Sequence, residues 1–382
     1  MKKVLCFLII LFLGINIVKG EENTLAPGAK SAILIEQSTG KMLYEFNSHE
    51  KRNPASMTKI MSMLLIMEAL EKKQIKMDQV VTVSANASSM GGSQILLEEG
   101  EKMKVEDLLK GVAIASGNDA VVALAETVAG SEANFVKMMN EKVKELGLSD
   151  TNFKNCHGLD EEGHYSSAYD MAYIARELIK HEKILEFSSI YDTYLRENTD
   201  RKIWLVNTNK LVKFKSGVDG LKTGYTKDAG YCLTATMKKD NMRVIATVMG
   251  EENPSTRNSE VSSLLDYAYS QVGVKKVLPK DKVLKKLELS KAKDTIEITP
   301  KEDVTMLYKK SDKNMKPTYK IKVNEIKLPI KKGTIVGKLD LYNSNKKINT
   351  INLVVKDNVD KSNIIELYLK NLKSMITGDI KF

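Results

Sequence analysis

The pattern of apolar and polar positions changes several times along the chain. Residues 31–36 and 41–46 form two apolar-rich runs separated by Gly40, and this pattern predicts a β-hairpin. Residues 60–70 follow as an apolar run without glycine or proline, rich in Met, Leu and Ala, which predicts a mostly buried helix. A strand pair and a core helix are therefore expected near the N-terminus.

Helical periodicity then dominates, and strands return later. The pattern predicts helices over 105–115, 119–129, 132–146 and 167–180, punctuated by turns at Gly117, Gly130 and Gly147. After Gly217 it predicts strands over 221–226, 230–237 and 243–249, and then a helix over 259–271. Strands on both sides of a helical block predict one sheet assembled from distant segments, with the helical block packed beside it.

Short alternating runs replace this pattern from about Val277. Runs at 304–308, 319–323, 335–341 and 351–355, with lysines outward, predict a small β-rich domain. The final segment predicts an amphipathic helix, whose apolar stripe is Ile365, Tyr368, Leu369, Leu372, Met375 and Ile376. It is too short and too charged to span a bilayer but suits a membrane interface. The alternative is a helix docked on its own β domain.

The N-terminus has the composition of a secretory leader. A short basic start precedes an apolar stretch from Val4 to Val18, shorter than a membrane span requires. The expected organisation is a leader at 1–20, a first domain at 21–275, a basic β-rich domain at 276–363 and an amphipathic helix at 364–382. We therefore expect an exported protein.

Charge is distributed unevenly over these parts. The whole chain has a net charge of +10, but residues 276–363 hold 22 lysines and 11 acids, whereas residues 21–275 are net negative. In an exported protein a basic module suggests an anionic lipid or wall polymer as partner, rather than nucleic acid. A merely soluble, lysine-rich surface explains the same count.

Cysteine and histidine provide little candidate chemistry. Only Cys156 and Cys232 remain once the leader is removed, which is too few for a disulfide framework, although the two could pair. Cys156 and His157 are neighbours and would point apart in an extended segment, so they are interpreted as structural. No Cys/His cluster has the spacing of metal ligands, and no metal site is expected.

Ser56 and Lys59 are the strongest candidate nucleophile and base. They precede the core helix and are three residues apart, which places both side chains on one helical face. A serine needs a neighbouring base, and a lysine can serve if burial or positive charge lowers its pKa. S-x-x-K occurs five times in this chain, and Ser56 could instead be a helix N-cap, so the motif needs partners.

Two later motifs supply such partners. Ser116-Gly117-Asn118 lies between two predicted helices, at a turn from which side chains can project into a cleft. Lys222-Thr223-Gly224 occurs once and begins a predicted strand. Its cation and hydroxyl suit an anionic group, and the glycine would let a substrate backbone approach the sheet. An exposed edge with a turn glycine is the alternative.

In this order, S-x-x-K, S-x-N and K-T-G are typical of penicillin-binding proteins and class A β-lactamases. The surrounding sequence resembles the low-molecular-mass penicillin-binding proteins that act as serine-type D-alanyl-D-alanine carboxypeptidases, at 54–59, 115–120, 157–160 and 219–226. The resemblance implies an α+β fold: a transpeptidase-like domain with an antiparallel sheet and a helical block, then a small all-β domain and a C-terminal amphipathic helix. It covers about residues 25–275 strongly and the rest loosely.

The resemblance also implies a catalytic role for several motif residues. Ser56 would attack the carbonyl of the bond between two terminal D-alanines, and Lys59 would accept the serine proton. Ser116 would relay that proton to the leaving amine, and Asn118 would orient Lys59 and the substrate amide. No metal or organic cofactor is implied.

Other motif residues would bind the substrate. Lys222 would hold the terminal carboxylate and also lower the pKa of Lys59 by like-charge repulsion. Thr223 and Arg257 would share that carboxylate, beside Gly224. The backbone N–H groups of Ser56 and Tyr225 would form the oxyanion hole. Tyr225 stands where some relatives carry histidine.

The implied substrates are peptidoglycan stem peptides ending in D-Ala-D-Ala, with β-lactam antibiotics as inhibitors. The implied place is the cell wall at the outer face of the cytoplasmic membrane, with peripheral attachment through the C-terminal helix. A β-lactamase of the same fold is an alternative, although no E-x-x-L-N stretch lies between Ser116 and Lys222. A catalytically silent wall-binding protein is another, although every catalytic position is filled.

Overall fold

An antiparallel five-stranded sheet forms the centre of the first domain in the computed structural model, which describes residues 25–312 and 315–377. The predicted leader lies outside the described residues. The strand order is β2-β1-β9-β8-β7. The strands are β1 (Ser31–Glu36), β2 (Met42–Phe46), β7 (Val218–Thr226), β8 (Gly230–Lys239) and β9 (Met242–Glu251). The expected sheet of distant segments is confirmed, since β1 pairs with both β2 and β9.

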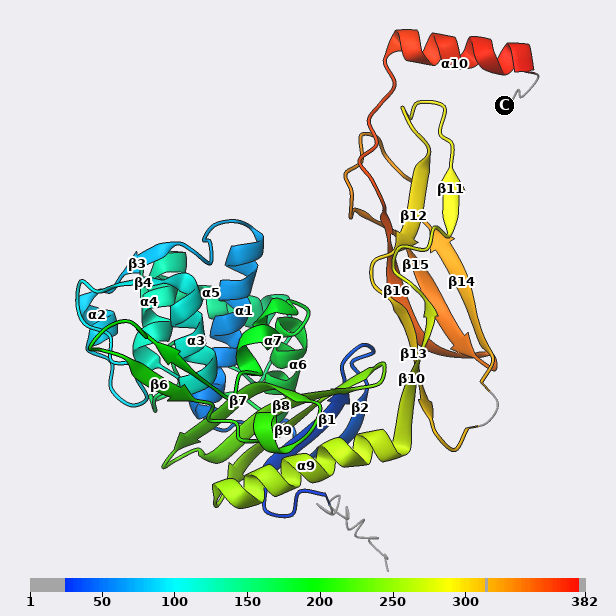
Figure 1. Cartoon of the computed structure of the whole chain (residues 1–382). Coiled ribbons are helices and arrows are strands. Elements are labelled where there is room, and N and C mark those ends of the chain that lie inside the picture. Colours follow the sequence, from blue (N-terminus) through cyan, green and yellow to red (C-terminus); the bar gives the residue numbers. More distant parts are fainter. Residues whose placement is uncertain (1–24, 313–314, 378–382) are drawn as a thin grey trace, which may run out of the picture.

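Helices cover both faces of this sheet (Figure 1). One face carries the helical block, which contains the 3₁₀ turn η1 (Ala55–Thr58), α1 (Lys59–Glu71), α2 (Ala85–Ser88), α3 (Val105–Ala115), α4 (Asn118–Ala129), α5 (Glu132–Glu145), α6 (Ala168–Leu178) and α7 (Lys183–Ser188). The other face carries α9 (Pro254–Gln271). β1 is therefore buried on both sides: Ile33 and Ile35 join the core under the helical block, whereas Ala32 and Leu34 join the core under α9.

Smaller elements border the helical block, and sequence periodicity did not predict them. They are the hairpin β3 (Val80–Thr82) and β4 (Lys102–Lys104), the hairpin β5 (Asp192–Leu195) and β6 (Ile203–Val206), and α8 (Leu211–Phe214). Each is only three or four residues long, too short for a periodic pattern to be recognised.

The predicted start of the last helix of this domain was wrong. The helix α9 begins at Pro254 rather than at residue 259. Asn253 caps it by accepting a hydrogen bond from the backbone N–H of Thr256, and proline suits the first helical position.

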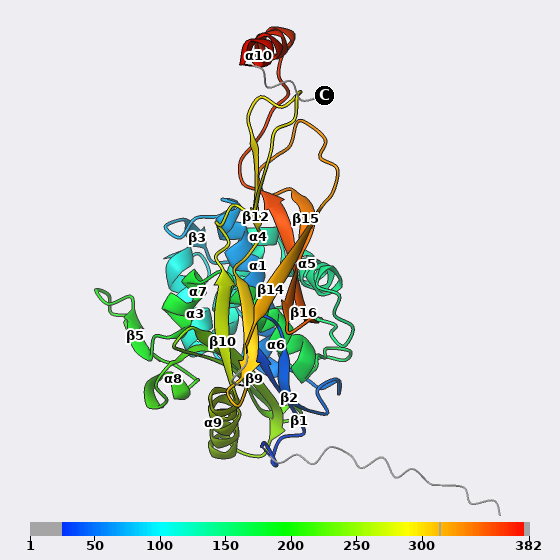
Figure 2. The same ribbon diagram turned by 90° about the vertical axis from the view of Figure 1, so that its right-hand side faces the viewer.

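A second, all-β domain continues directly from α9. β10 (Val272–Leu278) starts at the residue after α9 and pairs with β13 (Val304–Lys309). The five-stranded sheet beside this pair contains β11 (Lys285–Leu287), β12 (Ile296–Pro300), β14 (Pro317–Val323), β15 (Ile335–Asn343) and β16 (Lys346–Val355). Figure 1 shows this domain beside the first, and Figure 2 is turned so that it lies in front of the first. β10 spans the predicted boundary between 275 and 276, and that boundary stays a prediction.

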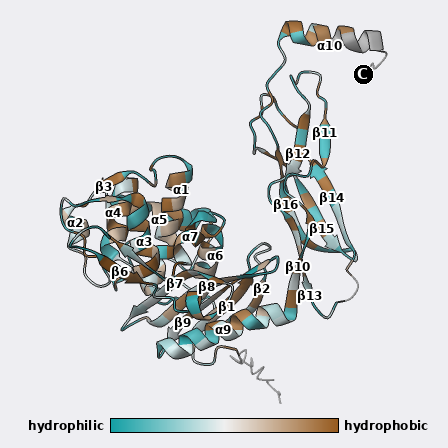
Figure 3. Cartoon of the chain, in the orientation of Figure 1, coloured by the Kyte–Doolittle hydropathy of each residue, from teal (hydrophilic) through white to brown (hydrophobic). Residues whose placement is uncertain are grey.

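The helix α10 (Ile364–Thr377) ends the described chain beyond the β domain (Figure 1). Figure 3 shows hydrophobic and hydrophilic residues alternating along it. Its described apolar side chains are exposed, from 85% for Ile364 to 40% for Leu372. No helix in residues 25–312 and 315–377 is long and apolar enough to cross a membrane.

Candidate active site

Ser56 and Lys59 meet where η1 leads into α1. Lys59 Nζ lies 3.0 Å from Ser56 Oγ, which confirms that the spacing brings the two side chains together. The N-cap of η1 is Pro54 and that of α1 is Thr58, so the alternative of Ser56 as a helix cap is wrong. The Ser56 hydroxyl is thus available to Lys59.

Lys59 is completely buried among polar partners. Its Nζ lies 2.6 Å from Asn118 Oδ1 and 2.7 Å from the main-chain oxygen of His157. Burial lowers the pKa of Lys59 from 10.5 to about 7, against smaller opposing contributions from Cys156 and Asp119. A substantial fraction of this amine is therefore neutral near pH 7.

The S-x-N motif connects two helices at the same place. Ser116 ends α3 in the left-handed region, at φ 64°, and Asn118 is the first residue of α4. Asn118 Nδ2 donates to the main-chain oxygen of Gly91 at 2.7 Å, which orients Asn118 Oδ1 toward Lys59. Ser116 Oγ is buried and has no hydrogen-bond partner among the described residues. The turn thus holds the Asn118 side chain against Lys59 and leaves the Ser116 hydroxyl without a hydrogen bond to the described residues.

The K-T-G motif lies within β7, not at its beginning as predicted, because the strand starts at Val218. Lys222 is completely buried, and its Nζ donates to the main-chain oxygen of Thr223 at 3.0 Å. Burial lowers the pKa of Lys222 well below 10.5, and repulsion from Lys59 and Arg257 adds to this. We expected repulsion from Lys222 to lower the pKa of Lys59. The main cause is instead the burial of Lys59 itself.

The interpretation of Gly224 also changes. A Cβ atom at Gly224 would lie 2.6 Å from the main-chain oxygen of Pro54 and 3.2 Å from the Cβ of Ala55. The missing side chain thus allows β7 to pack against η1, and the approach of a substrate backbone stays a prediction. This contact places Lys222 and Ser56 on neighbouring elements.

The remaining predicted residues surround the same motif. Thr223 Oγ1 donates to Thr208 Oγ1 at 2.8 Å. Tyr225 is half exposed and stacks on Tyr231 with ring centroids 4.2 Å apart. Arg257, on α9, is 5% exposed and close enough to Lys222 to lower its pKa. All nine predicted residues therefore belong to one assembly of η1, α1, the α3–α4 turn, β7 and α9.

A segment between α5 and α6 completes the site, although no role was predicted for it. His157 supplies the main-chain oxygen that contacts Lys59, and Gly158 follows at φ 89°. A Cβ at Gly158 would lie 1.9 Å from the main-chain oxygen of Ala55. The only sequence signal was its membership of the stretch 157–160 that carried the family resemblance.

The two cysteines are buried free thiols, so they do not pair. Burial raises the pKa of the Cys156 thiol well above 9 and that of Cys232 to about 11. Both are therefore protonated at neutral pH, and their interpretation as structural residues is consistent with this.

Comparisons with known proteins agree with this geometry. The family model described as D-alanyl-D-alanine carboxypeptidase (peptidase S11) matches residues 19–253, and that of the penicillin-binding protein 5 C-terminal domain matches 274–361. D-alanyl-D-alanine carboxypeptidase DacF of Bacillus subtilis (strain 168) is 53% identical over 344 residues, covering 89% of this chain and 88% of that protein.

Solved structures have the same fold. Penicillin-binding protein 5 from Haemophilus influenzae superposes with a TM-score of 0.71 at 31% identity, covering 87% of this chain and 98% of that one. Penicillin-binding protein D2 from Listeria monocytogenes in its ampicillin-bound form has a TM-score of 0.57 at 29% identity, covering 63% and 98%. The chain therefore belongs to the peptidase S11 family of serine-type D-alanyl-D-alanine carboxypeptidases, among the low-molecular-mass penicillin-binding proteins.

Proposed function

We propose that this enzyme removes the terminal D-alanine from peptidoglycan stem peptides through an acyl-enzyme on Ser56. The observation that carries the proposal is the 3.0 Å contact between Ser56 Oγ and the Nζ of Lys59, a buried amine with a pKa of about 7. A base with a pKa near the working pH is suited to accept the serine proton.

The hydrogen bonds of Lys59 support its role as that base. A neutral amine has two N–H donors and one lone pair. The carbonyl oxygens of Asn118 and His157 can accept only, so they take both donors. The lone pair then remains for the Ser56 hydroxyl. In the neutral state Ser56 therefore donates to Lys59, and its oxygen is activated for attack.

The reaction proceeds through one covalent intermediate. Ser56 Oγ bonds to the carbonyl carbon of the penultimate D-alanine while its proton moves to Lys59. The backbone N–H groups of Ser56 and Tyr225 stabilise the developing oxyanion. When the C–N bond breaks, Ser116 passes a proton from Lys59 to the leaving amine of D-alanine. Water then hydrolyses the ester and frees Ser56.

Three side chains recognise the terminal carboxylate of the substrate. Lys222 and Arg257 supply positive charge, and Thr223 supplies a hydroxyl donor. Burial makes these contacts stronger than they are in water, because the surroundings screen charge less. A free carboxylate next to the scissile bond is the feature that distinguishes a stem-peptide terminus from an internal peptide bond.

The test is release of D-alanine from a synthetic tripeptide ending in D-Ala-D-Ala by residues 21–382. We expect turnover by the intact enzyme, and neither D-alanine release nor covalent penicillin labelling in Ser56→Ala. Ser290→Ala, which removes the serine of another S-x-x-K match in the β domain, is the matched control and should retain both activities. Labelling of Ser56→Ala on a different serine contradicts the assignment.

The lifetime of the penicillin adduct distinguishes the β-lactamase alternative. A carboxypeptidase of this family should stay labelled, whereas a lactamase hydrolyses the adduct rapidly. The similarity to an ampicillin-bound structure supports acylation by penicillins. Rapid release of the hydrolysed drug at the rate of a lactamase overturns the proposal.

We also propose that the protein is exported and attaches peripherally to the outer face of the cytoplasmic membrane. Exposure of Ile364, Ile365, Tyr368 and Leu369 on α10 supports attachment, because these side chains are not covered by the β domain. Such a helix can lie in the lipid interface with its apolar side inward. The basic β domain adds attraction to anionic lipid.

A further inference from the structure

Neither carboxyl oxygen of Glu251, at the end of β9, accepts a hydrogen bond from an N–H or O–H donor of the described residues. The residue is 1% exposed, and both carboxyl oxygens are buried. A buried ionised carboxylate without partners is strongly unfavourable, so such a group is neutral or shares a proton. No proposed step of the reaction uses this residue.

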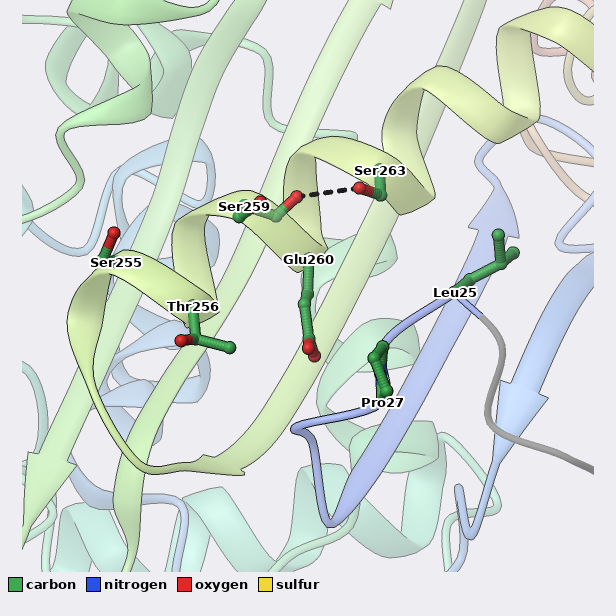
Figure 4. A pocket seen from close by; sticks show the side chains of 7 residues that line it. All are labelled: Leu25, Pro27, Ser255, Thr256, Ser259, Glu260 and Ser263. Atoms are coloured by element: carbon green, nitrogen blue, oxygen red, sulfur yellow. Dashed lines mark hydrogen bonds between the residues drawn. The ribbon is translucent and has the colours of Figure 1, made fainter.

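Glu260 on α9 approaches the same place. Its carboxyl group accepts hydrogen bonds from the backbone N–H groups of Gly28 at 2.8 Å and Ala29 at 3.2 Å. Figure 4 shows Glu260 extending from α9 toward the segment that contains Pro27. A Cβ at Gly28 would lie 2.6 Å from Glu251 Oε2 and 3.0 Å from Glu260 Oε1, so the two carboxyl groups converge on one point.

These contacts favour a single negative charge on the pair formed by Glu251 and Glu260. Two backbone N–H groups donate to the Glu260 carboxyl, so its oxygens have donors that those of Glu251 lack. A second negative charge beside it is disfavoured, so Glu251 keeps its proton. Burial, together with the neighbouring Glu260, raises the pKa of Glu251 from 4.5 to about 9, although Arg257 opposes this.

Arg257 connects this pair to the substrate site. It lies on α9 one turn before Glu260, and its guanidinium donates two hydrogen bonds to Asn258 Oδ1, at 2.9 and 3.1 Å. Its positive charge lowers the pKa of both Glu251 and Lys222, so it is near both groups. An ionised Glu251 would therefore compete with the substrate carboxylate for Arg257.

We propose that Glu251 and Glu260 share one proton, and that the neutral Glu251 keeps Arg257 available for the substrate's terminal carboxylate. This rests on the proposed function, because the carboxylate is that of the substrate. Glu251 is then a positioning residue, which acts through Arg257. The other titratable groups around the pair are Glu252, Tyr231 and Cys232, with Lys30 and Arg52 beside Gly250.

The charge state of the pair has a measurable consequence. Below about pH 9 Glu251 is neutral and Arg257 binds substrate, whereas above it Glu251 ionises and attracts Arg257. The KM for a peptide with a free terminal carboxylate should therefore rise with pH in this range. An amidated peptide should not show this dependence, since it offers Arg257 no charge.

Three variants test the proposal with the tripeptide assay between about pH 6 and 10. Glu260→Gln keeps an acceptor for Gly28 and removes the negative charge beside Glu251. Burial still raises the pKa of Glu251, but less than burial and Glu260 together, so KM for the free-carboxylate peptide should begin to rise at a lower pH than in the parent, with little change in kcat. In Glu251→Gln/Glu260→Gln no carboxylate remains, so this shift should be lost and KM at pH 7 should lie within about twofold of the parent value. Glu325→Gln, on the exposed surface of the β domain, is the matched control.

Two results would overturn the proposal. One is a KM in Glu260→Gln that begins to rise at the same pH as in the parent, with thermal stability retained. The other is a double variant as impaired as Glu260→Gln, which would indicate a packing role. Carbon-13 NMR of the Glu251 carboxyl, assigned by its loss in Glu251→Gln, gives an independent measurement: we expect a midpoint near 9, and a midpoint near 4.5 contradicts the shared proton. The NMR result does not depend on the enzyme's activity, so failure of the proposed function is distinguishable from failure of this inference.

Discussion

Lys59 Nζ lies 2.7 Å from the main-chain oxygen of His157, which binds the first residue of α1 to the segment between α5 and α6. The same segment is bound a second time, because Ser62 Oγ donates to the main-chain oxygen of Cys156 at 2.6 Å. The position of the proposed base therefore depends on backbone groups as much as on side chains.

Gly158→Ala should impair both stability and acylation. At φ 89° a side chain is strained, and the new Cβ would meet the Ala55 carbonyl, so we expect a loss of more than about 2 kcal/mol in the free energy of unfolding. Gly147→Ala is the matched control: it has φ 69° but no atom within 4 Å of an added Cβ. Urea unfolding and penicillin acylation rates measure the difference. Equal losses in the two variants would refute a role for the Ala55 contact.

The rate of acylation should depend on the charge of Lys59. Because the protonated amine has no lone pair, kcat/KM should be low below pH 7 and rise to a plateau as pH increases through about 7. The low pKa of Lys222 predicts loss of its charge at higher pH, and thus a rise in KM for carboxylate substrates on the alkaline side. Pre-steady-state kinetics of penicillin acylation between pH 5 and 10 test the acid limb. A rate independent of pH across 7 excludes Lys59 as the base.

Lys222→Met should discriminate between substrates. Methionine approximates the volume of lysine without its charge, so the packing of β7 is largely kept. We expect kcat/KM for a peptide with a free terminal carboxylate to fall about a hundredfold, and that for its amidated analogue much less. The comparison requires steady-state kinetics on both peptides. Equal reductions would argue for a role in catalysis rather than in recognition.

Removal of residues 364–382 should release the protein from the membrane. The deletion removes the apolar side chains that α10 exposes, while the β domain that precedes it stays complete. Fractionation of cells that express the intact and shortened chains provides the measurement. Ile365→Asp with Leu369→Asp is the point-variant equivalent, and Lys361→Gln, just before α10, is its control. Membrane retention of the shortened chain, or a soluble intact chain, contradicts the proposal.

Most of the catalytic assembly could be predicted from the sequence because its residues lie in short local motifs. Ser56 and Lys59 are brought together by a spacing of three, and Ser116 and Asn118 by a turn. The residue types of these motifs indicate the chemistry, and the order of the motifs along the chain indicates the family. The sheet was also predictable, since apolar-rich runs that read as strands lie on both sides of a helical block in the sequence.

The rest depended on interactions that leave no local signal. A main-chain oxygen has the same identity at every residue, so the contact of His157 with Lys59 is not visible in its side chain. Nothing in the sequence indicates that η1 packs closely against Gly224. The proposed sharing of a proton depends on Glu251 from β9, Glu260 from α9 and the segment at Gly28, which lies far from both in the sequence. Each depends on long-range packing.

The pairing of β1 with β9 means that the central sheet cannot be completed until late in synthesis of the chain. Ser31 lies opposite Met249, so the nucleophile and its base leave the ribosome long before the strand that completes their sheet. A nascent chain can form the β1–β2 hairpin at once, but the other edge of β1 stays open until β9 is made. A chain truncated before β7 would carry Ser56 and Lys59 without Lys222 and Thr223. Translation must continue beyond Arg257 on α9 before every residue of the proposed site is present.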